Sequence, residues 1–355
     1  MCYMSPVKKP IRGPSNPLKH TKMLFLLALS IVVFMLVCSC LVIWKRQFSF
    51  TEQVTLPVHK PPRTVVSISS FSQRVFHIIE CLDSVFAQSQ APDRVIISIP
   101  LKFRVEEGMS NVDYLHRFWD TVVYSTMYNE SEQDILNFFS KYVDAPYVFN
   151  AQTHIQNKSY VYEIGALTVQ FLQEDWGPAS KVMGALLLET HPDTIIITLD
   201  DDVVYHKDAV KWLATHMQHG IAIAFGCEFW NDDTERETAG IIANPILDFV
   251  IPNPRVCPGW LYGFLGAAYS ISSFGPDIWT FMQSLPLGCF YNDDIWLSAY
   301  VAMRGVRRVY SLAVPFQRHK RYEPLSVSTI INSEERKLEC ARYLFSIDSS
   351  RLSIK

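Results

Sequence analysis

The feature of this sequence that most constrains its fold is a regular alternation between residues 64 and 226, where apolar, β-branched runs alternate with segments of helical periodicity. Fully apolar runs predict strands that are buried on both faces of a sheet. The predicted strands are 64–69, 93–101, 166–172, 194–199 and 221–226, and the predicted helices are 72–88, 177–191 and 207–220. This order predicts a doubly wound α/β fold, with a mostly parallel sheet and helices on both faces.

An uncharged apolar segment of 22 residues, 23–44, precedes this domain. As a helix it would span roughly 30 Å, the thickness of a bilayer's hydrocarbon core. More Lys and Arg residues precede the segment than follow it, so we expect the N-terminus in the cytosol. The sequence therefore predicts a single-pass type II protein of the Golgi or ER membrane: a cytosolic tail over 1–22, a signal anchor over 23–44, a short stem over 45–63 and a luminal domain over 64–355. A cleaved secretory leader is the alternative, and it leads to the same compartment.

The composition gives no sign of nucleic-acid binding. The 355 residues carry a net charge of −3, whereas nucleic-acid-binding domains normally show a basic excess. No G-x-G-x-x-G follows the first predicted strand, and the chain has no G-x-x-x-x-G-K-[ST], so neither a dinucleotide-binding nor a P-loop motif is present. The sequence does not decide whether the chain forms a homodimer.

Two features agree with a secretory compartment. Asn129 and Asn157 each begin a glycosylation sequon. The predicted luminal domain also holds an odd number of cysteines, so at least one is expected to be free or paired between chains. These cysteines are Cys81, Cys227, Cys257, Cys289 and Cys340.

Three consecutive aspartates, Asp200, Asp201 and Asp202, follow the predicted strand 194–199. Three like charges repel one another, so a cation or a basic side chain is expected beside them. In an extended segment Asp200 and Asp202 would share one side and form a hard oxygen site for Mn²⁺ or Mg²⁺. Ligands of such sheets bind beyond the carboxyl ends of the strands, which favours this interpretation. The alternative is a solvated acidic turn that caps the helix near Lys207.

An Asp-x-Asp after an apolar strand, in a luminal α/β domain behind a type II anchor, resembles the GT-A glycosyltransferase superfamily. "SISSFSQR" at 67–74 is similar to the first strand and turn of family-2-like members, and "DWGPASK" at 175–181 to a segment before their metal strand. The resemblance implies a nucleotide-sugar donor, Mn²⁺ (or Mg²⁺), and a glycan, glycoprotein or glycolipid acceptor. It also implies that the donor is bound by Ser69, Arg74, Lys181, Asp200 and Asp201. The second strand ends in "SIPL", which departs from the uracil-binding aspartate of family-2 enzymes.

The segment "CFYNDDIWLSAYVAMRG" at 289–305 resembles the acidic helix start of exostosin-like members. Asn292 can cap a helix that begins at Asp293. In an inverting reaction a carboxylate takes the proton of the acceptor hydroxyl. We expect Asp294 to be this base and Asp293 to contact acceptor hydroxyls, although both carboxylates could simply complement the helix dipole.

His319 lies where some members of the superfamily have a third metal ligand, so the predicted metal ligands are Asp202, Asp200 and His319. A surface or phosphate-binding role within the basic segment 318–321 is the alternative for His319. Trp260 and Tyr262 could stack on a sugar ring or belong to the core.

Two other functions remain open from sequence. A catalytically silent member would bind glycans or act as a chaperone. A metal-dependent hydrolase or phosphotransferase would need a nucleophile or a histidine pair near Asp200, and only His206 lies near it in the sequence.

Overall fold

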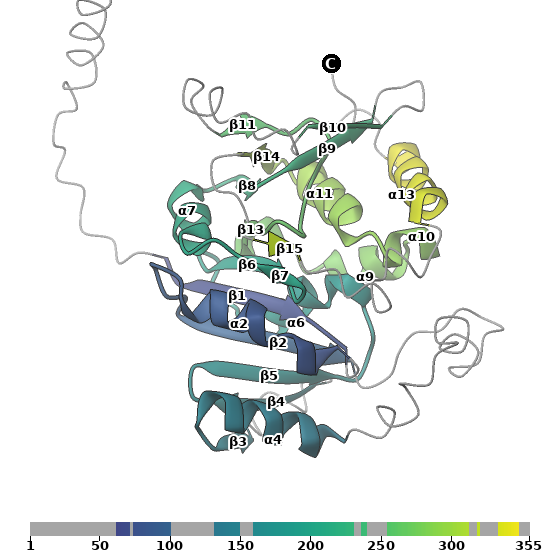
Figure 1. Cartoon of the computed structure of the whole chain (residues 1–355). Helices are drawn as coiled ribbons and strands as arrows, with labels where there is room; N and C mark the ends of the chain where they lie inside the picture. The colour runs from purple at the N-terminus through teal and green to yellow at the C-terminus, as the bar shows by residue number, and fades with distance from the viewer. Residues whose placement is uncertain are drawn as a thin grey trace, which may run out of the picture. The chain divides into compact units, whose positions relative to one another are not determined.

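The computed structural model describes residues 62–71, 74–100, 131–149, 159–230, 236–239, 254–311, 318–319 and 333–347 (Figure 1). The chain divides into two units, Met1–Pro61 and Pro62–Lys355, and the described residues all belong to the second. The predicted anchor at 23–44 and the sequons at Asn129 and Asn157 therefore lie outside the described residues. No helix within the described ranges has both the length and the apolar character needed to span a bilayer.

A ten-stranded sheet lies at the centre of the second unit, in the order β11-β14-β8-β13-β6-β1-β2-β5-β4-β3. Its four middle strands run parallel: β5 (Leu167–Leu172), β2 (Arg94–Pro100), β1 (Thr64–Ser69) and β6 (Ile195–Asp200). These strands match the predicted ones closely because each is an almost fully buried apolar run, as a strand covered on both faces must be. The predicted parallel α/β core is confirmed.

The flanks of the sheet depart from the predicted parallel arrangement. β13 (Ala267–Ser270) runs antiparallel to both β6 and β8 (Ile221–Ala224), and β4 (Ser159–Ile164) runs antiparallel to β5. β4 and β5 form a hairpin that turns at Gly165, whose φ of 58° lies in the left-handed region. A connection this short holds no crossover helix, so the two strands cannot be parallel. The remaining strands are β3 (Tyr147–Phe149), β14 (Arg307–Tyr310) and β11 (Arg255–Val256).

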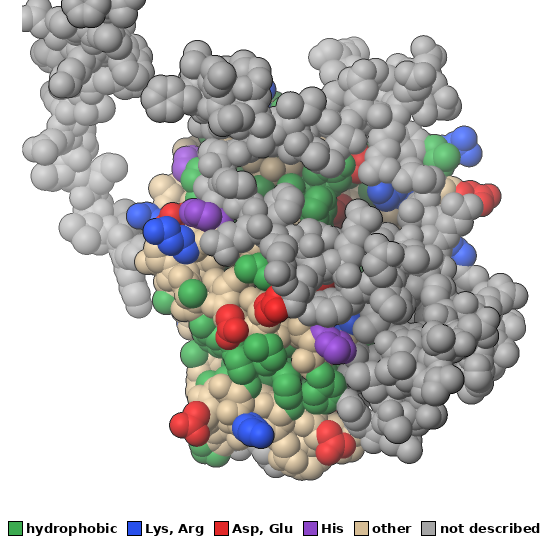
Figure 2. All heavy atoms as spheres, in the orientation of Figure 1, with side chains coloured by type: hydrophobic (Ala, Val, Ile, Leu, Met, Phe, Trp, Pro, Cys, Tyr) green, Lys and Arg blue, Asp and Glu red, His purple; other side chains and the backbone are tan. Residues whose placement is uncertain are grey.

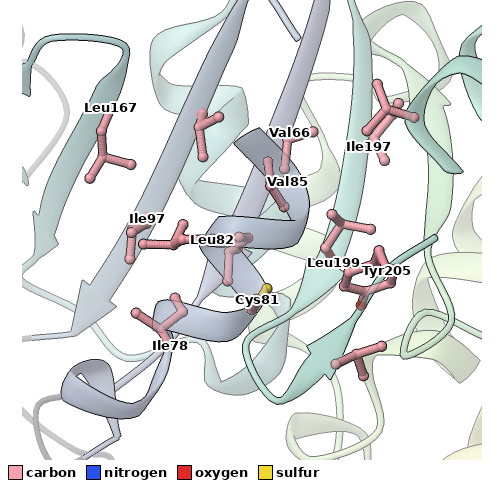
Figure 3. Packing of buried hydrophobic residues seen from close by; sticks show 14 of the residues in the cluster. Val66, Ile78, Cys81, Leu82, Val85, Ile97, Leu167, Ile197, Leu199 and Tyr205 are labelled. Atoms are coloured by element: carbon pink, nitrogen blue, oxygen red, sulfur yellow. The ribbon is translucent and has the colours of Figure 1, made fainter. Parts of the chain in front are cut away.

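Helices cover both faces of this sheet (Figure 1). On β1, Val66 packs in one hydrophobic cluster with Leu82 of α2 (Figure 3). The neighbouring Val65 packs in another cluster with Ala185 of α6, on the opposite face of the sheet. Alternate side chains of the strand thus serve the two faces. The helices are α2 (Ile79–Phe86), α4 (Glu132–Val143), α6 (Ser180–Leu188), α7 (Ala209–His216), α9 (Ile278–Gln283), α10 (Leu287–Phe290), α11 (Asp293–Met303) and α13 (Ser333–Ile347).

Short elements complete the described structure. Two of the predicted helices begin with a 3₁₀ turn, η1 (Val75–His77) before α2 and η2 (Gly177–Ala179) before α6, and a third turn is η3 (Ile271–Ser273). Small sheets pair β9 (Cys227–Trp230) with β10 (Arg236–Ala239) and β12 (Trp260–Leu261), and β7 (Val203–Val204) with β15 (Arg318–His319). Figure 2 shows hydrophobic side chains on the surface over α2 and α4, with carboxylates between them.

Two disulfides tie the C-terminal half together. Cys227 bonds to Cys257, and Cys289 bonds to Cys340, which joins α10 to α13. Cys81 is free and buried. The odd cysteine count was therefore a correct indication that one thiol stays outside the disulfides.

Candidate functional site: an acidic cluster at the strand ends

The aspartate run lies at the carboxyl ends of β1 and β6, where Asp200 is the register partner of Ser69. β6 ends at Asp200, and residues 201–202 form a turn instead of continuing the strand. The hydroxyl of the buried Tyr205 fixes this turn, because it accepts a hydrogen bond from the Asp200 amide at 2.8 Å and donates one to the Phe264 carbonyl at 3.0 Å. The aspartates therefore project from the edge at which open α/β sheets bind ligands.

Arg74 is the cation beside two of these aspartates. Its buried guanidinium forms ion pairs with Asp201 and, at 3.1 Å, with Asp202. Ser70 donates a hydrogen bond of 2.6 Å to the other Asp201 oxygen. Burial nevertheless raises the pKa of Asp201 to about 6, although Arg74 opposes the shift. Residues 201–202 form a turn in place of the extended segment expected there, and Asp201 and Asp202 share Arg74.

Lys181 is the second cation of the cluster and joins two elements that are distant in sequence. Its buried Nζ lies 2.8 Å from Asp200 Oδ1 and 3.1 Å from Asp293 Oδ2 at the start of α11. Burial lowers the pKa of Lys181, but the neighbouring aspartates outweigh it and hold the pKa well above its usual value. Lys181 is therefore charged, and it holds the β6 end and the α11 start together.

The "GPASK" segment positions Lys181 through close packing. Gly177 has a φ of 59°, and a Cβ there would lie 2.6 Å from the Phe290 carbonyl oxygen, so only glycine lets η2 approach α10 this closely. The hydroxyl of Ser69 donates to the Pro178 carbonyl at 3.1 Å, and that of Ser67 donates to the Lys181 carbonyl at 2.5 Å. The Ser69 hydroxyl therefore has a hydrogen-bond acceptor in the backbone of the "GPASK" segment.

Asp294 presents the only half-buried carboxylate of the α11 start. One of its oxygens accepts a hydrogen bond of 2.9 Å from the Gly263 amide. Burial raises its pKa to about 8, helped by the charge of the adjacent Asp293 and opposed by Lys181. Burial also raises the pKa of Asp293 itself. Helix α11 begins at Asp293 as predicted, but Asn292 does not cap it: its amide group donates instead to the Gly288 carbonyl at 2.7 Å.

The backbone of His319 lies beside the aspartate run. β15 pairs antiparallel with β7, and His319 is the register partner of Val203, the residue after Asp202. Two residues paired in this way have Cα atoms about 4.5–5.5 Å apart. The chain therefore brings the backbone of His319, more than a hundred residues away in sequence, beside Val203.

The aromatic residues proposed for sugar stacking are core residues. Trp260 and Tyr262 are each 6% exposed, and the Tyr262 ring packs edge-on against Phe264 at 5.2 Å. Of the two interpretations, the structure favours packing.

Five aspartates and two cations of the described residues meet in this cluster. Asp200, Asp201, Asp202 and Asp293 form ion pairs with Arg74 or Lys181, and the charges of Asp293 and Lys181 act on Asp294. Among the described residues, no three His, Cys, Asp or Glu side chains are arranged to hold a metal by themselves. Mg²⁺ sites commonly use one or two carboxylates, with water and substrate phosphates supplying the other positions.

Sequence reasoning did not identify three residues that shape this cluster: Ser70, Tyr205 and Gly263. Ser70 stands in the quoted "SISSFSQR", so its place after the first strand was a usable signal. Tyr205 and Gly263 act through contacts with residues that are distant in the chain, for which the sequence offers no local signal.

No protein-family model and no curated protein matches this sequence. Among solved structures, the chain is similar to S. aureus TarS 1-349, with 12% identity over 72% of this chain, 59% of that chain and a TM-score of 0.40. It is also similar to 4-diphosphocytidyl-2C-methyl-D-erythritolsynthase from Anaerococcus prevotii DSM 20548, with 8% identity over 80% of this chain, 99% of that chain and a TM-score of 0.38. TM-scores below 0.5 do not establish a common fold, so the function is argued from the site.

Proposed function

We propose that this chain is a metal-dependent glycosyltransferase that moves a sugar from a nucleotide-sugar donor to a glycan, glycoprotein or glycolipid acceptor. The observation that carries the proposal is the joining of two acidic groups by one buried lysine. Lys181 links Asp200, at the end of a parallel strand, to Asp293, beside the half-buried Asp294. The carboxylates at the strand end could bind the metal ion that neutralises the departing diphosphate. The carboxylates at the start of α11 could take the proton of the attacking hydroxyl.

The donor set fits a hard divalent cation such as Mn²⁺ or Mg²⁺. Asp202 and Asp200 would hold it through carboxylate oxygens, with His319 as a further ligand. When bound, such an ion neutralises the negative charge that develops on the leaving diphosphate. Arg74 and Lys181 orient the carboxylates that would face this ion, and their predicted contact with the donor is part of the same proposal.

Asp294 is the proposed base of an inverting transfer. The acceptor oxygen bonds to the anomeric carbon, the bond from that carbon to the diphosphate oxygen breaks, and the hydroxyl proton passes to the Asp294 carboxylate. With a pKa of about 8, Asp294 is ionised in only a minority of molecules at pH 7, and this ionised form is a stronger base than an exposed aspartate. The Gly263 amide holds one of its oxygens, which leaves the other to receive the proton.

A secretory location is part of the same proposal. Disulfides form and persist mainly in oxidising compartments, and four of the five cysteines after residue 64 are paired. Together with the apolar segment 23–44, these bonds support a Golgi or ER membrane protein with the residues after 44 in the lumen.

A catalytically silent glycan-binding or chaperone-like protein is the second candidate. The observation that favours it is that Arg74 and Lys181 already pair with Asp200, Asp201 and Asp202. A network of this kind can be purely structural. A hydrolase is less favoured, because His206 faces Asp208 at 3.7 Å and is not directed to the cluster by any contact within the described residues.

The proposal is tested by measuring nucleotide release from a panel of nucleotide sugars, with Mn²⁺ or with chelator. Release that requires metal and is lost in Asp202→Ala supports the transferase. Asp193→Ala is the matched control, because Asp193 is an exposed aspartate just before the other end of β6. Absence of release with every donor, in a chain that is folded by circular dichroism, favours the silent protein.

A further inference from the structure

One buried hydroxyl lies between two segments of the acidic cluster that are distant in sequence. Tyr205 is 2% exposed, and its hydroxyl accepts a hydrogen bond from the Asp200 amide at 2.8 Å and donates one to the Phe264 carbonyl at 3.0 Å. An amide can only donate and a carbonyl can only accept, so the two partners fix the direction of both hydrogen bonds. This hydroxyl therefore ties the end of β6 to the segment before β13.

The end of β6 needs such a partner because its pairing with β13 stops early. The last residue of β6 in register with β13 is Thr198, whereas β6 continues to Asp200. Side chains hold the backbone there: the Tyr205 hydroxyl accepts from the Asp200 amide, and the Cys81 thiol donates to the Asp200 carbonyl at 3.3 Å. The position of the Asp200 carboxylate therefore depends on these two side chains as well as on the sheet.

The other partner of the hydroxyl belongs to a tight turn over residues 263–266. The Gly266 amide closes this turn by donating to the Gly263 carbonyl at 2.8 Å, as in a β-turn. The Gly263 amide in turn donates to the Asp294 carboxylate at 2.9 Å. The Phe264 carbonyl and the Gly263 amide stand on neighbouring residues of one closed turn, so a shift of the turn moves both contacts together.

These bonds close a ring of contacts around the acidic cluster. Lys181 forms ion pairs with Asp200 and Asp293. The tyrosine hydroxyl and the turn make a second connection, from Asp200 to Asp294, the next residue of α11. The first connection is ionic and the second is made of hydrogen bonds to the backbone. The strand end and the helix start are thus held together on two sides.

We propose that Tyr205 is a positioning residue that holds the proposed metal-binding turn and the proposed base in a fixed relative position. The inference rests on the proposed glycosyltransferase function, to which it adds a residue that touches neither the donor nor the acceptor. Transfer requires the anomeric carbon, held on the metal side, and the acceptor oxygen, held beside Asp294, to meet at bonding geometry. The Tyr205 hydroxyl supports that geometry because it contacts the backbone on both sides.

Tyr205→Phe removes this hydroxyl and leaves the rest of the side chain in place. The ring packs in the same hydrophobic cluster as Leu199 (Figure 3), and the Tyr205 amide donates to the Ser84 hydroxyl at 3.1 Å. Neither contact depends on the phenolic oxygen, so we expect the variant to fold.

Tyr300→Phe is the matched control. Tyr300 is also 2% exposed, and its hydroxyl likewise accepts from a backbone amide, that of Gly275 at 3.0 Å, and donates to Asp277 at 2.9 Å. The two variants lose the same chemical group from equally buried sites. Only the hydroxyl of Tyr205 contacts the strand end and the turn of the acidic cluster.

The first measurement is hydrogen exchange on the full chain in detergent, followed by mass spectrometry with fragmentation to single residues. In Tyr205→Phe we expect the amides of Asp200 and Gly263 to exchange about tenfold faster than in the wild type, because the turn loses its anchor. In Tyr300→Phe both should exchange as in the wild type, while the Gly275 amide exchanges faster. Unchanged exchange at Gly263 in Tyr205→Phe, or the same increase there in both variants, would overturn the inference.

Nucleotide release at increasing Mn²⁺ is measured on the same samples. Tyr205→Phe should show a kcat lower on the order of tenfold and a higher half-saturating Mn²⁺ concentration, with Tyr300→Phe equal to the wild type. An active wild type with an equally active Tyr205→Phe would retain the transferase and overturn the positioning role. A wild type that releases no nucleotide, with faster exchange at both amides in Tyr205→Phe, would support the coupling and reject the transferase.

Discussion

The two ends of the parallel strands carry ionic networks of different composition. Where β1 and β2 begin, Arg63 and Arg94 both contact Glu189, at 3.0 and 3.2 Å, and Arg94 also pairs with Glu163. This network has two cations and two carboxylates, and Arg63 is 44% exposed. At the other end, five buried or half-buried aspartates share Arg74 and Lys181.

Under the proposed function, the first network fastens the fold and the second is prepared for a ligand. In the first network the buried Glu189 has two cations as partners, and the exposed Arg63 contributes little to stability. An excess of buried carboxylates is costly unless a proton or a cation meets it, and the raised pKa values of Asp201, Asp202 and Asp294 express that cost. Strongly perturbed groups gathered at one edge of a sheet are typical of functional sites.

Removing the proposed base should give the largest effect. In Asp294→Asn we expect transfer to fall by about 10²–10⁴-fold, because the acceptor proton loses its base. The same variant should melt at a higher temperature than the wild type at pH 8, since a neutral amide avoids a buried charge. Initial rates and thermal melts measure the two effects, with Asp193→Asn as the control. Unchanged transfer would exclude Asp294 as the base.

Removing the bridging cation should destabilise the fold strongly. Lys181→Met leaves Asp200 and Asp293 buried without their partner, so we expect a loss of roughly 3–5 kcal/mol in the free energy of unfolding. At the opposite end, Arg63→Met removes a partly exposed partner and should cost at most about 1 kcal/mol. Urea unfolding of both variants makes the comparison. If both variants lose the same free energy of unfolding, the two ionic networks contribute to stability in the same way and the comparison fails.

The Gly263 contact can be broken without changing any charge. A Cβ at this position would come closer than 3.0 Å to Asp294 Oδ1, so Gly263→Ala should displace the carboxylate. A displacement of about 1 Å can reduce a rate by up to a hundredfold. Steady-state kinetics should therefore show a lower kcat in a folded protein. Both substitutions act on the Asp294 carboxylate, so the double variant Gly263→Ala/Asp294→Asn should have almost the same kcat as Asp294→Asn alone. If the two reductions in kcat are additive, the coupling between Gly263 and Asp294 is contradicted.

The last prediction concerns the pH dependence of stability. The pKa of Asp294 rises from 3.8 to about 8 on folding, and that of Asp201 to about 6. Between about pH 4 and 8 the folded chain keeps protons that the unfolded chain releases, so stability falls as pH rises, by an amount on the order of a few kcal/mol. Thermal melts in chelator at pH 5 and 8.5 should show this loss, and Asp294→Asn should show less of it. Identical profiles would contradict the assignment of the raised pKa.

Sequence patterns predicted the parts of this molecule that are determined by residues close together in the sequence. The hydrophobic pattern predicts the buried strands at 64–69 and 194–199. Short motifs predict the aspartates at a strand end and the start of α11 at Asp293. The partners of these groups depend on long-range packing. Lys181 meets Asp293 across more than a hundred residues, and the Gly263 amide meets Asp294 across 31 residues. Pattern reading does not extend to such contacts.

The measurement that tests the central claim most directly is calorimetric titration of Mn²⁺ into the full chain with and without uridine or guanosine diphosphate. We predict one Mn²⁺ per chain, bound more tightly with a nucleoside diphosphate, with binding lost in Asp202→Ala and retained in Asp193→Ala. If the wild type binds no Mn²⁺ with either diphosphate, or if Asp202→Ala binds it equally well, then the acidic cluster is a structural network like the one at the opposite end of the strands.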